Sequence, residues 1–123
     1  MLEVVIKQVI ESITKPIIGD KKVFPVMGTC KPPLVTYTIT PVAGGTVKES
    51  QIEVKAIAGD IDKAIEIREA ISGKLDMTAD IPSIEVGNIV FRSGLAGGGM
   101  LFNDSIQTWE LNSIFIITWR CKD

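Results

Sequence analysis

Hydrophobic residues recur with two different periods along the chain, and the longer period marks two expected helices. From Leu2 to Ile13 apolar residues return every three or four positions, which is typical of an amphipathic helix. Because Pro16 disfavours the helical conformation in the residue before it, we expect this helix to end at Lys15. A second helix is expected from the N-cap Asp60 to a C-terminal stop at Gly73. Its predicted apolar stripe consists of Ile61, Ala64, Ile65, Arg68 and Ile71.

A period of two predicts the strands. Residues 34–40 and 51–56 alternate apolar and polar positions, so they are expected to pair as an antiparallel hairpin across a flexible loop at about 42–49. A short strand from Val23 to Val26 should lie at a sheet edge, because Pro25 lacks a backbone donor. Further strands are expected at 84–91, where Gly87-Asn88 forms either a turn or a bulge, and at 107–120.

Together these elements predict a single α+β domain over residues 1–123. The expected fold is a mostly antiparallel sheet of four to five strands with two helices, in the order α-β-β-β-α-β-β. The length is that of one ordinary domain with one hydrophobic core.

The last expected strand is apolar on both faces in its second half. One face carries large apolar residues, whereas Ile114 and Ile116 lie on the other. Such a strand is either central in a sheet that is covered on both faces or pressed against another subunit. Ile114 and Ile116 are therefore candidate residues of a subunit interface. The residues of the first face are Trp109, Leu111, Phe115, Ile117 and Trp119.

A glycine-rich segment at about 94–104 is expected to form a second flexible loop. One interpretation is a hairpin loop with no further role. The other is a docking loop, because it carries apolar residues that can anchor a partner protein. The candidate docking residues are Leu95, Gly97, Gly98, Gly99, Met100, Leu101 and Phe102.

Composition narrows the possible partners. The 123 residues are 46% hydrophobic and 23% charged, and 13 basic against 15 acidic side chains give a net charge of −2. No basic run is present, so direct nucleic-acid binding is not expected. The chain starts without a basic, signal-like region and has no apolar run near the ~20 residues of a membrane span, so we expect a cytoplasmic protein with no membrane partner. Cys30 and Cys121 are expected to be free thiols.

The sequence offers little for catalysis. It contains no histidine, which removes the commonest general base and every Ser-His or Cys-His arrangement. The pair Asp60 and Asp62 is explained by helix capping, and Asp76 and Asp80 by a polar loop, so no metal site is expected. The glycines lack the G-K-[ST] ending of a phosphate-binding loop. We therefore expect no enzymatic activity and no cofactor.

The order of elements resembles a known family. It consists of an initial helix, a strand opening at Pro33–Tyr37, a strand at Ile52–Ala56 that runs into the helix at Asp60, and a final strand ending at Phe115–Trp119. This order is similar to that of the tail terminator or tail completion proteins of long-tailed bacteriophages and phage-derived particles, including the lambda tail terminator. The resemblance covers nearly the whole chain, and it departs from the family in the richness of glycine at Gly97–Gly99.

The resemblance implies a ring, usually of six subunits, that caps the tail tube, stops its polymerisation and presents a surface to the head or neck. The implied partners are further copies of the chain, the tail tube protein, and a connector or neck/sheath protein. Assembly would take place in the host cytoplasm, and the ring would then lie at the head-proximal end of the tail. Three alternatives stay open: a head-tail connector or neck ring, a small carboxylate-based ligand-binding domain, and a monomeric regulatory module.

Overall fold

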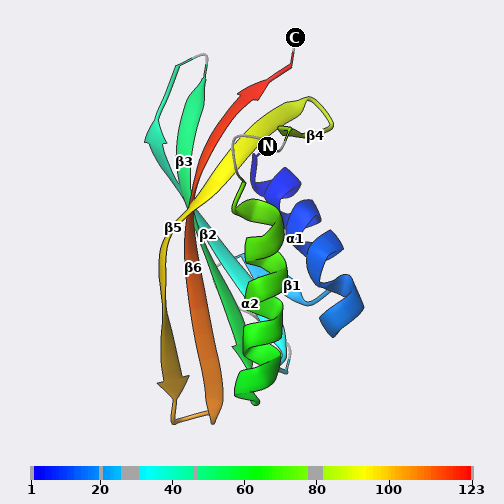
Figure 1. Ribbon diagram of the computed structural model, residues 1–123, viewed down its shortest axis with the longest axis vertical. Coiled ribbons are helices and arrows are strands. Elements are labelled where there is room, and N and C mark those ends of the chain that lie inside the picture. Colours follow the sequence, from blue (N-terminus) through cyan, green and yellow to red (C-terminus); the bar gives the residue numbers. More distant parts are fainter. Residues whose placement is uncertain (1, 20, 26–30, 46, 78–81, 123) are drawn as a thin grey trace.

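A computed structural model describes residues 2–19, 21–25, 31–45, 47–77 and 82–122. These residues form two helices and six strands, and the strands make one sheet in the order β1-β2-β3-β6-β5-β4. Both helices lie on the same face of this strongly twisted sheet (Figure 1), so the prediction of an α+β fold is confirmed. The elements are α1 Leu2–Ile18, β1 Val23–Pro25, β2 Leu34–Ala43, β3 Lys48–Ala58, α2 Ile61–Leu75, β4 Ile84–Val86, β5 Ile89–Asn103 and β6 Thr108–Cys121.

The prediction of four to five strands was wrong, because the described residues form six. The residues Gly87 and Asn88 make a turn between β4 and β5, and Gly87 adopts the left-handed φ of 60° that favours glycine. The sheet is also partly parallel, since β1 pairs in parallel with β2. A period-two pattern does not encode strand direction, so the sequence could not show this. Val26, predicted as the end of the first strand, lies outside the described residues.

The hydrophobic core fills the space between the two helices and the sheet. Strand β6 lies between β3 and β5. Of the apolar residues that the alternation predicted on one face, Leu111, Phe115 and Ile117 are fully buried, and the two tryptophans at the ends, Trp109 and Trp119, are partly buried. The core unites residues that are far apart in sequence, from the first turn of α1 to the last strand. Its main members are Leu2, Ile6, Ile10, Val35, Tyr37, Ile52, Val54, Ile67, Ile71, Leu75, Ile89, Phe91, Phe115 and Ile117.

Helix α1 extends beyond the predicted end at Lys15 and contains Pro16. A proline near the end of a helix removes only one hydrogen bond, and here Ile17 and Ile18 pack against the core. The left-handed Gly19, with φ of 84°, ends the helix by donating its N–H to the carbonyl of Lys15 at 2.9 Å. Tertiary packing therefore overrides the local preference of the residue before proline.

Helix α2 begins as predicted and ends later. The side chain of Asp60 accepts a hydrogen bond from the backbone N–H of Asp62 at 3.1 Å, which confirms the predicted N-cap. Gly73 was predicted as the C-terminal stop, but it lies inside the helix, which continues because Leu75 is fully buried in the core. The predicted stripe was correct only in part. The buried residues of α2 are Ala64, Ile67, Ile71 and Leu75.

Both predicted flexible loops are shorter than expected. Residues 94–103 are not a loop but the second half of β5, where they pair with β6 from Gly94 opposite Ile116 to Asn103 opposite Thr108. A bulge between Leu95 and Gly97 interrupts the register. In the predicted loop 42–49, the first two residues belong to β2 and the last two to β3. Pairing with a strongly apolar neighbour compensates for the low strand propensity of glycine.

The phenol of Tyr37 makes the stability of the fold sensitive to alkaline pH. Burial, assisted by the carboxylates of Glu11 and Glu3, raises the pKa of Tyr37 above its ordinary value of about 10. The folded state thus favours the neutral phenol, and this contribution is complete below pH ~10 and is lost as pH rises through the folded pKa. Between pH ~9 and ~11 the wild type should lose more unfolding free energy than Tyr37→Phe in urea titrations. Parallel curves for the two proteins would contradict this prediction.

Candidate functional site

The β5–β6 hairpin projects at one end of the molecule, opposite the β2–β3 turn (Figure 1). We call residues 97–114 the distal hairpin. Its turn is fixed by hydrogen bonds: the side chain of Asn103 accepts from the N–H of Ser105 at 3.1 Å, and the amide of Gln107 donates to the carbonyl of Asp104 at 2.7 Å. The amide of Asn103 also donates to Glu110 at 3.2 Å. These bonds hold the neighbouring apolar side chains in defined positions.

Large apolar side chains are exposed along this hairpin and just before it. The exposed fractions are 47% for Leu95, 50% for Met100, 62% for Leu101 and 38% for Phe102, all predicted docking residues. Sequence reasoning missed Ile106, which is 59% exposed in the turn. The sequence feature that could have identified this residue is its position as a single isoleucine among the polar residues 103–107. Such a concentration of exposed apolar residues is typical of a protein-docking surface.

The structure divides the predicted docking residues between two faces. In the pairing with β6, Leu95 lies opposite Phe115, Met100 opposite Leu111 and Phe102 opposite Trp109. These three residues of β5 therefore lie on the helix side of the sheet. The rings of Phe102 and Trp109 contact each other with centroids 4.9 Å apart. Leu101 pairs with Glu110 and lies on the uncovered face. A partner that contacts all four residues must therefore reach around the sheet edge.

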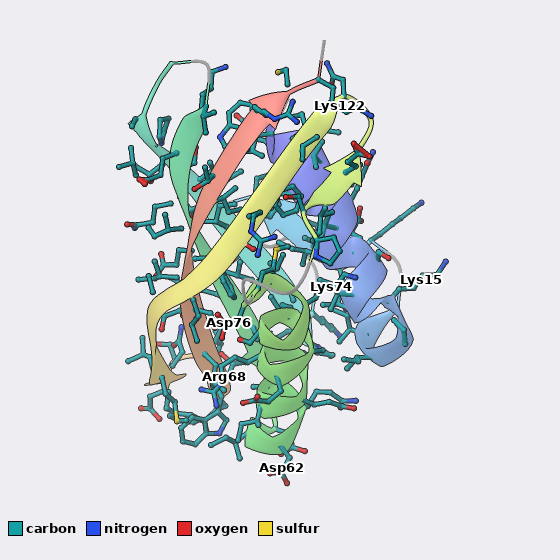
Figure 2. All side chains as sticks on the ribbon, turned by 45° about the horizontal axis from the view of Figure 1, so that its top comes forward. Lys15, Asp62, Arg68, Lys74, Asp76 and Lys122 are labelled. Carbon is teal, nitrogen blue, oxygen red and sulfur yellow. The ribbon has the colours of Figure 1, made fainter. Side chains whose placement is uncertain are left out.

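A groove of about 500 Å³ separates α2 from the glycines of β5. Figure 2 shows Arg68 and Asp76 on the side of α2 that is turned toward β5 and β6. Gly98 lies on the helix side, where a Cβ atom would come within 2.5 Å of the backbone oxygen of Asn112. Only glycine fits at this position, because any side chain would overlap the backbone of β6. The lining residues of the groove are Arg68, Glu69, Ser72, Asp76, Leu95, Gly97, Gly98, Gly99, Met100, Asn112 and Ser113.

The C-terminal end of α2 binds the outer side of β5 just before this groove. The hydroxyl of Ser93 donates to the carbonyl of Leu75 at 2.6 Å, and the N–H of Met77 donates to the carbonyl of Ser93 at 3.0 Å. The N–H of Leu95 donates to the carboxylate of Asp76 at 3.1 Å. Residues 75–77 thus take the place of a neighbouring strand as far as Leu95.

Ile114 and Ile116 lie side by side on the sheet face that the helices leave uncovered, and both are half-buried. Each has a polar residue of β3 on one side and a glycine on the other, Gly97 beside Ile114 and Gly94 beside Ile116. A Cβ atom at either glycine would meet nothing within 4 Å. The sequence left two environments open for this strand: a sheet that is covered on both faces, or contact with another subunit. The described residues cover only one face of the sheet. The role of the two isoleucines in a subunit interface stays a prediction.

A second apolar hollow lies at the other end of the molecule. It measures about 500 Å³ between the first turn of α1 and the β2–β3 end of the sheet. Trp119 lines it, and the ammonium of Lys48 lies 4.9 Å from the centre of its indole ring. Val42 and Val47, in the predicted loop region 42–49, are 56% and 53% exposed. The molecule therefore carries exposed apolar residues at both ends.

No cluster of three metal-binding side chains occurs in the part of the chain that the structure describes. Asp60 and Asp62 act at the helix N-terminus, and Asp76 binds the backbone of β5. Asp80 and Cys30 lie outside the described residues, and Cys121 is an exposed free thiol. Neither α1 nor α2, the helices of the described residues, combines the length and apolar character needed to cross a membrane.

Comparison with known proteins identifies a similar fold. No protein-family model and no curated protein matches the chain. Among solved structures, it is similar to a chain of the "Virion of native gene transfer agent (GTA) particle", with a TM-score of 0.53 and 10% sequence identity. The match covers 90% of this chain and 84% of that chain. At this identity the comparison establishes a shared fold.

Two neighbouring glycines provide a matched test of the packing at the groove. We expect Gly98→Ala to lower the free energy of unfolding by about 1–3 kcal/mol, because the added methyl group overlaps the backbone of β6. Gly97→Ala should raise it by roughly 0.5–1 kcal/mol, since a Cβ atom there meets open space and alanine is favoured over glycine inside a strand. Chemical denaturation of both variants measures the difference. Equal stability of the two would show that the close approach at Gly98 does not exist.

Proposed function

We propose that the protein is a structural subunit of a phage or phage-like particle, which forms a ring on the tail tube and ends its growth. The observation that carries the proposal is the row of exposed apolar residues on a hairpin whose turn is held by hydrogen bonds. The similarity of the fold to a virion chain supports a role in such a particle. The ring would have six subunits and lie at the head-proximal end of the tail, in contact with a connector or neck protein.

The uncovered sheet face and the distal hairpin would serve different contacts. A closed ring needs two different complementary surfaces on each subunit. We assign Ile114 and Ile116 to the contact between subunits and Leu95, Met100, Leu101 and Phe102 to the contact with the tube. A terminator must match the last tube ring on one face and deny the next ring its template on the other. Tail length would then follow from capping, with neither catalysis nor a cofactor.

Light scattering over a wide concentration range, together with electron microscopy, tests this proposal. We expect either a ring in solution or a monomer that forms rings on the ends of tube polymers. Adding the protein to polymerising tube protein should shorten the tubes as its concentration rises. A strict monomer that never associates with tubes would refute the terminator function and favour a monomeric regulatory module. Association only with head components would favour the connector alternative.

Substitutions at the proposed seam should break the ring without unfolding the subunit. Threonine retains the strand preference of isoleucine but removes apolar area from the half-buried side chains of Ile114 and Ile116. The double variant Ile114→Thr/Ile116→Thr should therefore show the circular dichroism of a folded chain and lose the mass of the ring. Val47→Thr is the control, because Val47 is exposed at the opposite end of the sheet. A full-mass ring from the double variant would remove these residues from the seam.

A further inference from the structure

The outer edge of β5 beyond Leu95 has no neighbouring strand among the described residues. Before the bulge, the backbone groups of Ser93 and Leu95 point away from β6, because they bind residues 75–77. The bulge adds one residue and shifts the alternation. In the antiparallel pattern that follows, the backbone groups of Gly98, Met100 and Phe102 point outward. Three residues thus offer donors and acceptors to a further strand.

The other sheet edges are protected against strand addition. Strands β1 and β4 are three residues long, and β1 ends in Pro25. In β2 the N–H of Val35 points outward, to Lys22, so the alternation places the missing N–H of Pro41 on the same outer side. By contrast, residues 97–103 contain neither proline nor charge. Natural proteins usually protect an edge of this length, so its open state indicates a partner.

The sequence of this edge is complementary to itself. We infer that residues 97–103 pair in antiparallel orientation with the same residues of a second copy of this chain, around a two-fold axis at Met100. In this register the outward-pointing N–H and C=O groups of the two copies face each other. Gly98 of one copy lies opposite Phe102 of the other, and Met100 lies opposite Met100. On the other face Leu101 lies opposite Gly99, and Asn103 opposite Gly97. Each larger side chain except Met100 therefore meets a glycine, which avoids crowding.

The groove provides space for one side chain of the second copy. Phe102 of the second copy lies opposite Gly98 on the helix side, where the groove between α2 and β5 opens. A rotation of this ring from Trp109 of its own chain toward the edge would bring it into contact with Met100 and Leu95, where it would cover apolar surface that is about half exposed. The pairing ends at Gly97, because residues 75–77 occupy the edge up to Leu95. A second copy of the chain can thus fill both the outer edge of β5 and the groove between α2 and β5.

The pairing has a consequence for assembly, and only this consequence rests on the proposed function. The paired residues include Met100, Leu101 and Phe102, which we assigned to the tube contact. A copy in the pair therefore occupies the strand edge on which these docking residues of the other copy lie. Tube protein would have to separate the pair before a ring forms, which keeps an adhesive edge protected before assembly.

A cysteine experiment tests the register. In a background with Cys30→Ser and Cys121→Ser, Met100→Cys should form an intermolecular disulfide under mild oxidation, because the two Cα atoms would lie about 5.5 Å apart. Leu101→Cys is the matched control, since residue 101 is at least as exposed but would lie about 8 Å from its symmetry mate. A disulfide confined to position 100 is the expected result. Equal cross-linking at both positions, or none at position 100, would overturn the pairing.

A proline substitution tests the hydrogen bonds of the edge separately. Met100→Pro removes two intermolecular donors from the pair, one from each copy, but no bond within the chain. We expect dimerisation to weaken about 30-fold in sedimentation experiments, while the melting temperature of the monomer changes little. Met100→Thr, which retains the N–H, should weaken dimerisation much less. Equal dimerisation of the wild type and the proline variant would refute the pairing.

Tube binding by the wild type and by the oxidised Met100→Cys dimer separates this inference from the proposed function, because the wild type retains Met100. If the disulfide dimer forms and tubes bind the wild type but not the oxidised dimer, both proposals hold. If the disulfide dimer forms but the wild type binds no tubes, the pairing stands and the terminator function fails. If position 100 does not cross-link but rings form on tubes, the terminator function stands and the pairing is refuted.

Discussion

The fold depends on the burial of β6 between two partner strands. This strand pairs with β3 from Trp109 to Trp119 and with β5 along almost its whole length. Its helix-facing residues Leu111, Phe115 and Ile117 are fully buried. Helix α2 packs directly against this central strand, whereas α1 packs against α2, β1 and β2. Loss of β6 would separate β5 and β4 from the rest of the sheet. The hairpin that carries the candidate site therefore owes its rigidity to the same strand that organises the core.

The two helices cover one face of the sheet. Among the described residues, two kinds of surface therefore stay open: the other face of the sheet and part of one sheet edge. The uncovered face of the sheet carries Ile114 and Ile116 among polar neighbours and glycines. The sheet edges are protected by short strands, by proline and by the end of α2, which binds β5 as far as Leu95. Protection stops at Gly97, where the apolar residues of the distal hairpin begin. The boundary between protected and open edge coincides with the bulge in β5, which also shifts the outward backbone groups.

Local sequence patterns predicted correctly the helices and strands whose conformation follows from the preferences of their own residues. The alternation of residues 51–56 and 107–120 gave two long strands, and Asp60 marked the start of α2. The predictions failed where distant contacts decide the conformation. Pro16 and Gly73 lie inside helices because the following apolar residues reach the core. Residues 94–103 form a strand because β6 supplies a complete ladder for them. The candidate docking residues were found from their apolar character, but their division between two faces depends on the bulge, which no local pattern revealed.

The glycines of β5 have different explanations, and the difference favours a partner at this surface. Gly98 is required within the chain, because any side chain would meet the backbone oxygen of Asn112. Gly94 and Gly97 adopt no left-handed conformation, and a side chain at either would meet open space. Glycine inside a strand is destabilising by roughly 0.5–1 kcal/mol relative to alanine. Among the described residues, no close contact requires glycine at Gly94 or Gly97. Both border the isoleucines that we assigned to the contact between subunits, and in that proposal the missing side chains let a second surface approach the backbone closely.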